Sequence, residues 1–358
     1  MKRMPIKKII LLVAAFMVLT VIVYGAYTIY QIRNPQTLFE KSSMTEEVQP
    51  NGQADLTAPA ATEEKGTNQL EGTDEFKGDR VNVLLLGFDL APERKDMGVF
   101  RTDTAIIASI DFNNSQVYML SIPRDSYVEI PGFEGRYKYN DAFHMGGSFE
   151  GKGFEKAMET ASAFIGGIPV QYYMGVDMTV FKVVIDLIGG IEYDVDVPVV
   201  MNGRELKAGK QILTGQQALD YARNRHTKLA DIDRIDRQQR ILLATFEQLK
   251  SKTQLSKIPE IFLGVKDDIW TNMNVKQISG LALFGTNIDL NRIRRYTIPG
   301  GFLTYKGVSY WGIKQYEKAK LIEEIFGVKI EVNPTDDIGY LREQVEAAQG
   351  ENQQTSSN

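Results

Sequence analysis

The sequence predicts an α/β domain that follows one N-terminal transmembrane helix. Three short, continuously apolar runs, typical of strands buried on both faces, lie early in the domain, at residues 81–86, 104–110 and 117–122. A helix-capping Thr214 and an apolar stripe at helical spacing over residues 242–249 predict helices later in the chain. Strands and helices without a second linker indicate a single globular domain over residues 80–334.

Residues 1–33 predict a cytoplasmic stub and a transmembrane anchor. The uncharged apolar stretch 9–29 is long enough to cross a bilayer core of roughly 30 Å. It is longer than the apolar part of a cleaved signal peptide, the alternative, which usually has about 7–15 residues. Cations precede this stretch at Lys2, Arg3, Lys7 and Lys8, so the positive-inside rule leaves the N-terminus in the cytoplasm. We therefore expect a single-pass cell-membrane protein with an extracellular C-terminal domain.

Two segments have the composition of chains that do not fold alone. Residues 34–79 are rich in Thr, Glu, Ala, Gly, Gln and Pro without apolar periodicity, and residues 335–358 end in a polar run. Such segments bury too little apolar surface to offset the entropy lost on ordering. We expect a flexible extracellular stalk at 34–79 and a disordered tail at 335–358.

The composition excludes several classes of site. The chain has no cysteine, which rules out a disulfide framework, a thiol nucleophile and a zinc–thiolate site. With two histidines, His144 and His226, a Ser-His-Asp triad or a His-rich metal site is not expected. The net charge of −5 offers no global basic field for nucleic acid. Any catalysis must then depend on carboxylates, arginines and a bound metal.

The three predicted strands place charged residues at one rim of a sheet. Turn-forming residues at 111–115 separate the second strand from the third. In an antiparallel meander, the end of the first strand, the start of the second and the end of the third lie on one side. Asp89, Asp103 and the corner 123–125 would then share that rim.

Carboxylates and arginines on one rim suit a magnesium–pyrophosphate site. Mg²⁺ prefers oxygen ligands, commonly one or two carboxylates completed by water and substrate phosphates. We expect Asp89 and Asp103 to hold the metal while Arg101 and Arg124 contact phosphate oxygens. The alternative is that each Asp is an ordinary strand-end residue and each Arg a surface charge, because a single residue often matches a motif by chance.

A second group of arginines lies within residues 213–239, at Arg223, Arg225, Arg234 and Arg237. The guanidinium is a planar fork that matches two phosphate oxygens at once, and four of them this close repel one another unless an anion is bound. Arg223 and Arg225 are two residues apart in a segment expected to be extended, so their side chains should point to the same side. A helix expected to begin near Asp231 places the last two and Gln238 on one face.

The alternative for this cluster is a salt-bridged face, with carboxylates at Asp220, Asp231, Asp233 and Asp236. That alternative fits Arg240 better than it fits Arg223 and Arg225. The apolar stripe that follows, Leu242, Phe246 and Leu249, is expected to be core.

Six separated motifs resemble the LytR-CpsA-Psr (LCP) family. In chain order they are LLLGFD, RTDTAIIASID, MLSIPRDSYVEIPG, KYNDAFHMGG, VIDLIGGIEYDV and the arginine block. The single anchor and external domain are also similar to that family's layout. The resemblance implies an α/β/α sandwich on a mixed central sheet, with a hydrophobic cavity for a polyprenyl chain.

The resemblance also implies an activity. LCP proteins resemble transferases that move a glycopolymer, such as wall teichoic acid or capsule, from undecaprenyl pyrophosphate onto peptidoglycan. The C6-hydroxyl of N-acetylmuramic acid attacks the sugar-side phosphorus, and undecaprenyl phosphate leaves. The implied cofactor is Mg²⁺ or Mn²⁺. The implied partners are the lipid-linked glycopolymer, peptidoglycan and the cytoplasmic membrane of a Gram-positive bacterium, with no nucleic acid.

The family's motifs imply roles residue by residue in this sequence. The implied catalytic residues are Arg124, Arg223, Arg225, Asp89 and Asp103, and the two aspartates are also the implied metal ligands. The implied substrate-binding residues are Arg101, Lys138, Asn140, Asp231, Arg234, Arg237 and Gln238. Asp233 stands where the family more usually has glycine, and Tyr139 takes the middle place of a Lys-Ile-Asn motif.

Three apolar segments are candidates to line the lipid cavity, residues 161–168, 172–181 and 181–191, although each also fits an ordinary core. Three other functions stay open. One is a hydrolase that cleaves lipid pyrophosphate with water as acceptor, and another is a non-catalytic module that binds polyprenyl phosphates. The third, a nucleic-acid-binding regulator, conflicts with the outward topology and the acidic balance.

Overall fold

The computed structural model describes residues 30–31, 34–39, 80–90, 100–201, 203–224, 231–250, 265 and 268–355. The predicted transmembrane stretch and most of the predicted stalk lie outside these residues. Among the helices that are described, none combines the length and the apolar composition needed to cross a bilayer.

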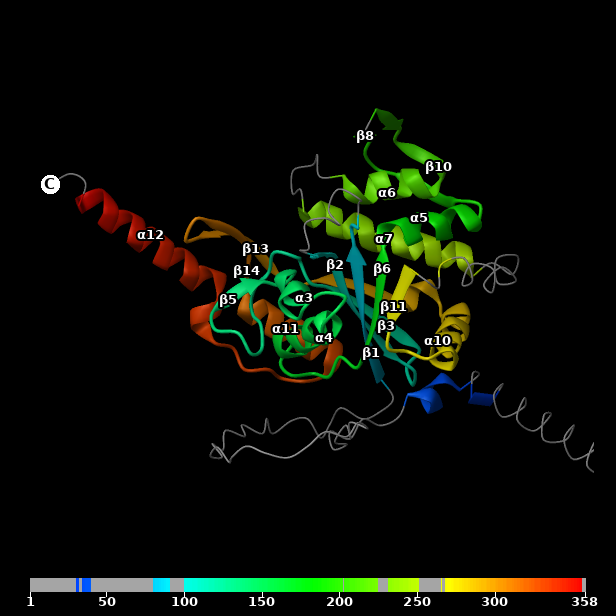
Figure 1. Cartoon of the computed structure of the whole chain (residues 1–358), viewed down its shortest axis with the longest axis horizontal. Helices are drawn as coiled ribbons and strands as arrows, with labels where there is room; N and C mark the ends of the chain where they lie inside the picture. The colour runs from blue at the N-terminus through cyan, green and yellow to red at the C-terminus, as the bar shows by residue number, and fades with distance from the viewer. Residues whose placement is uncertain are drawn as a thin grey trace, which may run out of the picture.

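A six-stranded mixed sheet forms the centre of the molecule, in the order β11-β6-β1-β2-β3-β12 (Figure 1). The strands are β1 (Arg80–Phe88), β2 (Thr102–Asp111), β3 (Gln116–Ser121), β6 (Tyr172–Asp177), β11 (Ile269–Thr271) and β12 (Ile293–Thr297). β1, β2 and β3 form the predicted antiparallel meander. β6 runs parallel to β1 and β12 parallel to β3, while β11 is antiparallel to β6. The predicted mixed central sheet is therefore confirmed.

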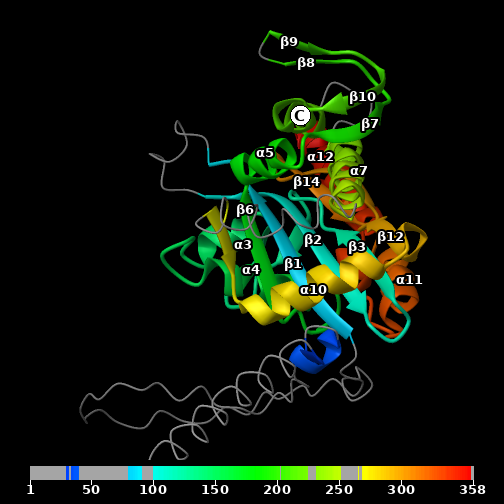
Figure 2. The same ribbon diagram turned by 90° about the vertical axis from the view of Figure 1, so that its right-hand side faces the viewer.

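Helices cover both faces of this sheet because the side chains of β1 alternate between two apolar layers. Leu84, Leu86 and Phe88 pack in one core with α3 (Asp141–Met145), α4 (Gly153–Phe164) and α11 (Gln315–Phe326). Val81 and Val83 pack in another core with α10 (Val275–Asn287). Figure 2 shows α10 lying across its face of the sheet. This layering is that of the expected α/β/α sandwich.

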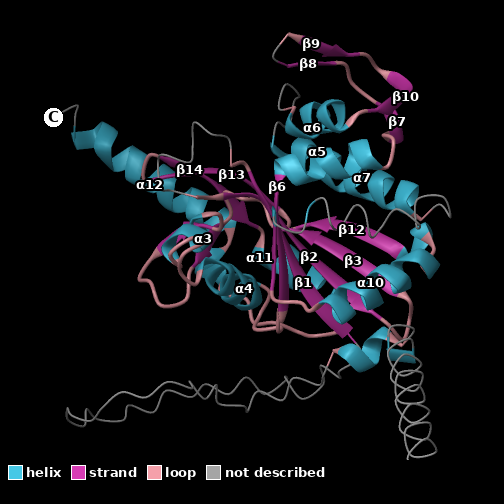
Figure 3. Cartoon of the chain, turned by 45° about the vertical axis from the view of Figure 1, so that its right-hand side comes forward, coloured by secondary structure: helices cyan, strands magenta, loops and turns pink. Residues whose placement is uncertain are grey.

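A second group of elements, with a core of its own, lies at the end of the sheet where β1 and β6 finish (Figure 3). Its helices are α5 (Met178–Leu187), α6 (Gly215–Arg223) and α7 (Asp231–Leu249). Its strands form a projecting arm of β7 (Ile191–Val195), β8 (Val199–Met201), β9 (Arg204–Leu206) and β10 (Gly209–Leu213). The predicted capping box at Thr214 and Gln217 is present and begins α6.

Two hairpins and three short 3₁₀ helices also belong to the described structure. The hairpins are β4 (Tyr127–Glu129) with β5 (Arg136–Lys138), and β13 (Gly300–Tyr305) with β14 (Val308–Ile313). The 3₁₀ helices are η1 (Pro35–Leu38), η4 (Leu290–Arg292) and η5 (Pro334–Asp336).

The prediction of a disordered tail is wrong for residues 338–355, which form α12 (Ile338–Thr355). The helix begins by burying Ile338 and Leu341, which are 5% and 8% exposed. Arg342 Nη2 donates to the carbonyl of Phe302 at 2.9 Å, so the first turns of α12 dock on β13. A polar average composition conceals the few apolar residues that make this contact.

The prediction of a flexible stalk is wrong at its beginning. Phe39 is 4% exposed, and its ring lies 5.8 Å from that of Phe112 and 5.3 Å from that of Tyr172. The amide of Gln277, on α10, donates to the carbonyl of Leu38 at 3.2 Å. The chain just after the predicted anchor therefore packs on the base of the domain, opposite the projecting arm (Figure 2).

Candidate active site

A β-bulge at the end of β1 sets the place of Asp103. Gly87 pairs with Thr104 and Phe88 pairs with Thr102, so Asp103 is the extra residue of the bulge. Bulges bend a strand, re-aim a side chain and recur next to active sites. A Cβ on Gly87 would lie 3.1 Å from Thr104 Cβ, which is closer than such atoms ordinarily pack. The close approach that positions Asp103 thus depends on glycine.

The corner after β3 brings Arg124 to the same rim. Its Nη1 donates to Asp103 Oδ1 at 2.7 Å, and its Nε lies 3.4 Å from Asp125 Oδ2. Lys138 Nζ lies 3.1 Å from Asp125 Oδ1, and the backbone N–H of Asn140 donates to the carbonyl of Arg124 at 2.9 Å. Side chain and backbone of Arg124 are therefore both fixed, as charge-assisted pairing requires.

Arg223 reaches this rim from the last turn of α6. Its Nη2 donates to Asp89 Oδ1 at 2.9 Å, and its Nε lies 3.1 Å from Met178 Sδ. The helix was expected to end one residue earlier, with Arg223 already extended, and that expectation is wrong because the extended residue is Asn224. Arg225 lies outside the described residues.

Polar side chains of α7 point inward, as their spacing predicted. Arg234, Arg237 and Gln238 are 3%, 2% and 9% exposed. Nη1 of Arg234 lies 3.4 Å from the carbonyl oxygen of Asp103. Asp231 begins the helix as predicted, and its side chain lies outside the described part of the structure.

Arg237 stabilises the junction between α6 and α7. Its Nη1 donates to the carbonyl of Asn224 at 2.6 Å, and its guanidinium carbon lies 5.8 Å from the centre of the Tyr221 ring. A cation over an aromatic face is itself favourable. Arg237 therefore positions the end of α6, where Arg223 is.

The outer part of the rim carries two further predicted residues. Arg101 Nε lies 2.8 Å from Asp141 Oδ1, with 57% of the arginine side chain exposed. Asn140 is 5% exposed, and its Oδ1 has no hydrogen-bond partner among the described residues. Between Lys138 and Asn140, Tyr139 is core: its hydroxyl donates to Ala157, and burial raises its pKa above the ordinary value.

Positive charge exceeds negative charge at this rim within the part of the chain that the structure describes. The cations are Arg101, Arg124, Lys138, Arg223, Arg234 and Arg237, and the carboxylates are Asp89, Asp103, Asp125 and Asp141. Such an excess in a partly buried place favours an anion. The roles of Asp125 and Asp141 were not predicted. The sequence feature that could have indicated these roles is that each aspartate directly follows a predicted site residue, Arg124 or Asn140.

The salt-bridge alternative is correct for Arg240, which lies 2.6 Å from Asp196 and 2.8 Å from Asp236. It does not describe Arg223, whose carboxylate partner is Asp89 on the sheet. Among the predicted counter-ions, Asp220 pairs with Arg204 at 2.8 Å.

An apolar cavity of about 370 Å³ adjoins the rim. Aliphatic and aromatic side chains of β1, β2, β6, α5 and α7 line it, together with Gly87, Thr104, Arg223 and Gln238. Arg223 thus contributes both to the cavity wall and to the charged rim. A deep, mostly apolar pocket with a few polar groups at one end is typical of a small-molecule site.

Two of the three segments that were candidates to line a lipid cavity contribute side chains to this cavity. Met174, Val176 and Phe181 line it, in agreement with the segment 172–181, and Val184 continues the lining from the segment 181–191. The segment 161–168 does not, because its apolar side chains pack into the core beside α4 on the other face of the sheet.

The apolar stripe of α7, Leu242, Phe246 and Leu249, was expected to be core. Leu249 packs against the core of the second group of elements, as expected, but all three side chains also line the cavity. Helical periodicity identifies the face that leaves water, but it does not distinguish packed neighbours from an empty space.

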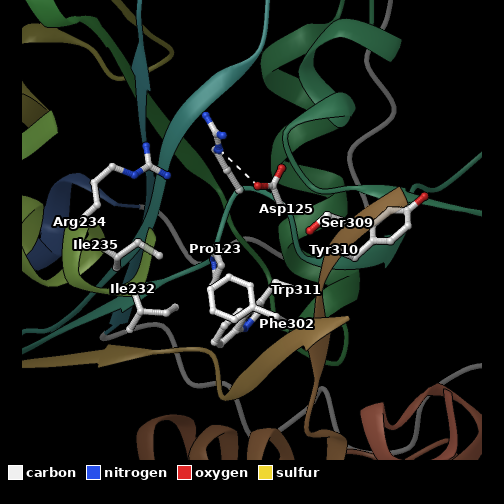
Figure 4. A pocket seen from close by; sticks show the side chains of 10 residues that line it. Pro123, Asp125, Ile232, Arg234, Ile235, Phe302, Ser309, Tyr310 and Trp311 are labelled. Atoms are coloured by element: carbon white, nitrogen blue, oxygen red, sulfur yellow. Dashed lines mark ion pairs between the residues drawn. The ribbon is translucent and has the colours of Figure 1, made fainter. Parts of the chain in front are cut away.

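A smaller pocket of about 50 Å³ is drawn in Figure 4, and Arg124 and Arg234 are among its lining residues. Its lining comes from the β3–β4 corner, the first turns of α7 and the hairpin β13–β14: Pro123, Arg124, Asp125, Ile232, Arg234, Ile235, Phe302, Ser309, Tyr310 and Trp311. We call it the aromatic pocket. None of its three hairpin aromatics was assigned to the site from the sequence.

The predicted metal ligands Asp89 and Asp103 lie near each other at one rim of the sheet. Asp89 and Asp103 give oxygen donors at neighbouring strand ends, and each also pairs with an arginine. Within the described residues, no cluster of three or more His, Cys, Asp or Glu side chains could hold a metal by itself. The donor set thus fits Mg²⁺ of the kind that substrate phosphates and water complete.

Comparison with known proteins agrees with this geometry. The model of the LytR_cpsA_psr family matches residues 53–327. The chain is 28% identical to an Enterococcus faecalis polyisoprenyl-teichoic acid--peptidoglycan teichoic acid transferase, TagU, over 68% of this chain and 78% of the relative. It is 31% identical to the Oceanobacillus iheyensis protein of the same name, over 70% of this chain and 76% of the relative.

Solved structures share the fold. The crystal structure of Bacillus subtilis TagV has 29% sequence identity and a TM-score of 0.59, over 69% of this chain and 97% of that one. A structure of TagT bound to LIIa-WTA has 26% identity and a TM-score of 0.56, over 70% of this chain and 92% of that one.

Proposed function

The chain belongs to the LytR_cpsA_psr family, and from this premise we propose that it is a glycopolymer transferase of the cell wall. It would take a glycopolymer from a polyprenyl pyrophosphate and attach it to peptidoglycan. The names of its relatives TagU and TagV describe transfer of teichoic acid from a polyisoprenyl carrier to peptidoglycan for those proteins. Teichoic acid is the polymer in those names, and the TagT structure holds LIIa-WTA as its ligand.

One observation carries the proposal. Arg223 lies in the wall of the apolar cavity and also pairs with Asp89 on the charged rim. A ligand that occupies both must be an amphiphile with an apolar chain joined to an anionic head. A prenyl chain gains roughly 0.8 kcal/mol for each methylene-sized group taken from water, and arginines match phosphate oxygens in pairs. A lipid pyrophosphate combines both properties.

The cavity fits only the part of the lipid nearest its head. At roughly 30 Å³ for a water-sized group, 370 Å³ accommodates about a dozen carbon-sized groups. The rest of an undecaprenyl chain would extend beyond it, towards the bilayer. We propose that the predicted anchor at residues 9–29 holds the protein in that bilayer, with the domain outside the cell.

The reaction would be a phosphoryl-group transfer. An acceptor hydroxyl forms a new O–P bond with the sugar-side phosphorus, and the bridging P–O bond breaks. Its electron pair leaves with undecaprenyl phosphate, and the hydroxyl proton passes to a carboxylate of the rim, Asp89 or Asp103, and then to water. Such chemistry is mostly positioning and charge neutralisation. Arg124 and Arg223 would neutralise the developing charge from fixed positions, without reorganisation.

Asp89 and Asp103 would hold Mg²⁺ or Mn²⁺ together with the donor's phosphates. When bound, the metal would add Lewis-acid stabilisation of the phosphate charge. Arg124 and Arg223, each paired with one of these aspartates, would orient the carboxylates for that role.

A transfer assay with the full chain in detergent tests the proposal. The chain is mixed with a prenyl-pyrophosphate-linked saccharide, uncrosslinked peptidoglycan glycan strands and Mg²⁺. We expect saccharide to become attached to the strands and prenyl monophosphate to appear. Released phosphosaccharide without attachment would indicate a hydrolase, and binding without turnover would indicate a non-catalytic lipid-binding module. A parallel assay with EDTA tests the metal, whose removal should suppress transfer.

A further inference from the structure

The hairpin β13–β14 carries aromatic side chains that the phosphate chemistry does not use. Phe302 is 54% exposed although it is a large apolar residue, and it is the cross-strand partner of Trp311. Their rings lie 5.6 Å apart at 89°, an edge-to-face pair. Both rings line the aromatic pocket (Figure 4).

The Trp311 ring is fixed in place rather than free to rotate. Its Nε1 donates to the carbonyl of Ile298 at 3.3 Å. A side chain on Gly300 would collide with the indole, so glycine there lets the ring lie against the strand. The pocket therefore has one rigid aromatic wall and one exposed aromatic edge.

The hairpin is joined directly to the charged rim. The backbone N–H of Trp311 donates to the carbonyl of Asp125 at 2.8 Å. Lys138 Nζ lies 5.7 Å from the Tyr310 ring centre and 3.1 Å from Asp125. Burial raises the pKa of Tyr310, and the nearby charge of Asp141 raises it further, so its hydroxyl stays protonated as a donor.

The pocket combines the groups that recognise a sugar ring. The apolar C–H face of a hexose packs on aromatic rings, while its hydroxyls need fixed donors and acceptors. Phe302 and Trp311 supply the rings, and Ser309 and Asp125 supply a hydroxyl and a carboxylate.

The aromatic pocket and the apolar cavity occupy different places along the charged rim, as two separate substrates require. In phosphoryl transfer, the attacking and leaving oxygens lie roughly in line, on opposite sides of phosphorus. The leaving lipid phosphate belongs to the apolar cavity, beside Arg223. Arg124 lines the aromatic pocket, and α7 connects the two: Ile235 lines the pocket and Ile241 the cavity, about 9 Å further along the helix.

We propose that the aromatic pocket forms part of the acceptor subsite, and that one sugar of a peptidoglycan glycan strand lies across its mouth and packs on Phe302 and Trp311. This inference rests on the proposed function and names the other substrate's place within it. Phe302 and Trp311 are binding residues for the acceptor, and Ser309 and Asp125 supply polar groups beside them. The competing occupant is the sugar of the donor, and measuring the donor KM and the acceptor KM separately distinguishes the two.

Direct binding tests the subsite without turnover. The chain has two tryptophans, so Trp270→Phe leaves Trp311 as the only indole. Titration of that full-length variant with soluble, uncrosslinked glycan-strand fragments should give a saturable change in Trp311 fluorescence. Phe302→Ala should weaken this binding about tenfold, the usual size of a lost aromatic contact. A flat titration overturns the inference.

Kinetics with a matched control identify the occupant. Phe302→Ala should raise the KM for glycan strands about tenfold and leave the donor KM and the Tm unchanged. Tyr316, on α11, is 55% exposed and serves as the control, so Tyr316→Ala should change neither KM. Phe302→Trp should restore the acceptor KM. A raised donor KM with an unchanged acceptor KM assigns the pocket to the donor's sugar and overturns the inference.

The two proposals fail in different ways. Transfer by the wild type with no response to Phe302→Ala leaves the transferase function standing and overturns the subsite. Glycan binding at Trp311 without any transfer supports the subsite and overturns the function.

Discussion

The apolar cavity and the aromatic pocket border different arginines of the charged rim and are built from different side chains: Arg223 lines the cavity, and Arg124 and Arg234 line the pocket. Side chains from several strands and helices line the cavity, and their positions span much of the domain. The pocket takes its lining from the corner after β3, the first turns of α7 and the hairpin β13–β14, where Phe302 and Trp311 are cross-strand partners. The apolar cavity selects a ligand by its apolar volume, whereas the aromatic pocket presents aromatic rings and polar groups at fixed positions. The difference suits a donor held by its tail and an acceptor held by its shape.

Loss of Arg124 should affect the charged rim and the aromatic pocket, because Arg124 pairs with Asp103 on the rim and also lines the pocket. We expect Arg124→Ala to lower kcat by about 100- to 1000-fold, the usual result of removing one preorganised donor to a developing oxyanion. The transfer assay measures the change. Arg295→Ala is the control, because Arg295 pairs with Asp236 on the surface and should leave kcat unchanged. A kcat for Arg124→Ala close to that of the wild type would contradict the site.

Filling the cavity should weaken the donor and spare the acceptor. Leu242 lines the cavity, so the larger ring in Leu242→Trp should reduce affinity for a prenyl pyrophosphate by about 10- to 100-fold. Affinity for inorganic pyrophosphate should not change. Ile212→Trp, at a position 63% exposed on the projecting arm, controls for the added indole. Equal loss of both ligands would show that the cavity and the rim do not act separately.

Lys318 lines neither the apolar cavity nor the aromatic pocket, so changing it should alter the stability of the protein and leave its activity unchanged. It is 8% exposed and donates to the carbonyl of Phe164 at 3.1 Å, and burial lowers its pKa from 10.5 to about 8. A depressed lysine pKa penalises folding at neutral pH, and the penalty disappears as pH rises from about 8 to 10.5.

We therefore expect Lys318→Met to be more stable than the wild type at pH 7, by on the order of 1–3 kcal/mol, less the lost hydrogen bond to Phe164. The advantage should shrink between pH 8 and 10.5, which urea unfolding at several pH values measures. A stability difference that is constant with pH would contradict the assignment. The transfer rate at pH 7 should stay as in the wild type.

The smallest effect concerns the length of the lipid. Because the cavity holds about a dozen carbon-sized groups, affinity should rise steeply up to chains of about that length and then level off. Soluble prenyl pyrophosphates of about 10, 15 and 20 carbons measure this by calorimetry. A continued steep gain from about 15 to 20 carbons would mean that the cavity opens further to admit the chain.

Much of the site could be predicted because its residues follow strand ends and helix caps. The three apolar runs predicted the meander, and the meander placed Asp89, Asp103 and Arg124 on one rim. The spacing of Arg234 and Gln238 predicted their shared burial. The bulge that aims Asp103 could not be predicted, because it depends on how Gly87 and Thr104 meet across two strands.

Other parts depended on contacts between distant segments. Phe39 is buried because Phe112 and Tyr172 lie next to it, and the start of α12 is buried because β13 lies under it. Both segments have polar surroundings in sequence, so their composition predicted disorder. Conversely, the α7 stripe has the pattern of a packed face and also lines a cavity.

The sequence by itself determined the order of strands in the meander, the start of α6, the inward face of α7 and the kind of charge at the rim. Each depends on residues that are neighbours along the chain, where periodicity and capping act. The tertiary structure alone decided where apolar space remains empty and which aromatic rings stand beside Arg124. Those features depend on how separately formed surfaces fit together, and no local pattern encodes the fit.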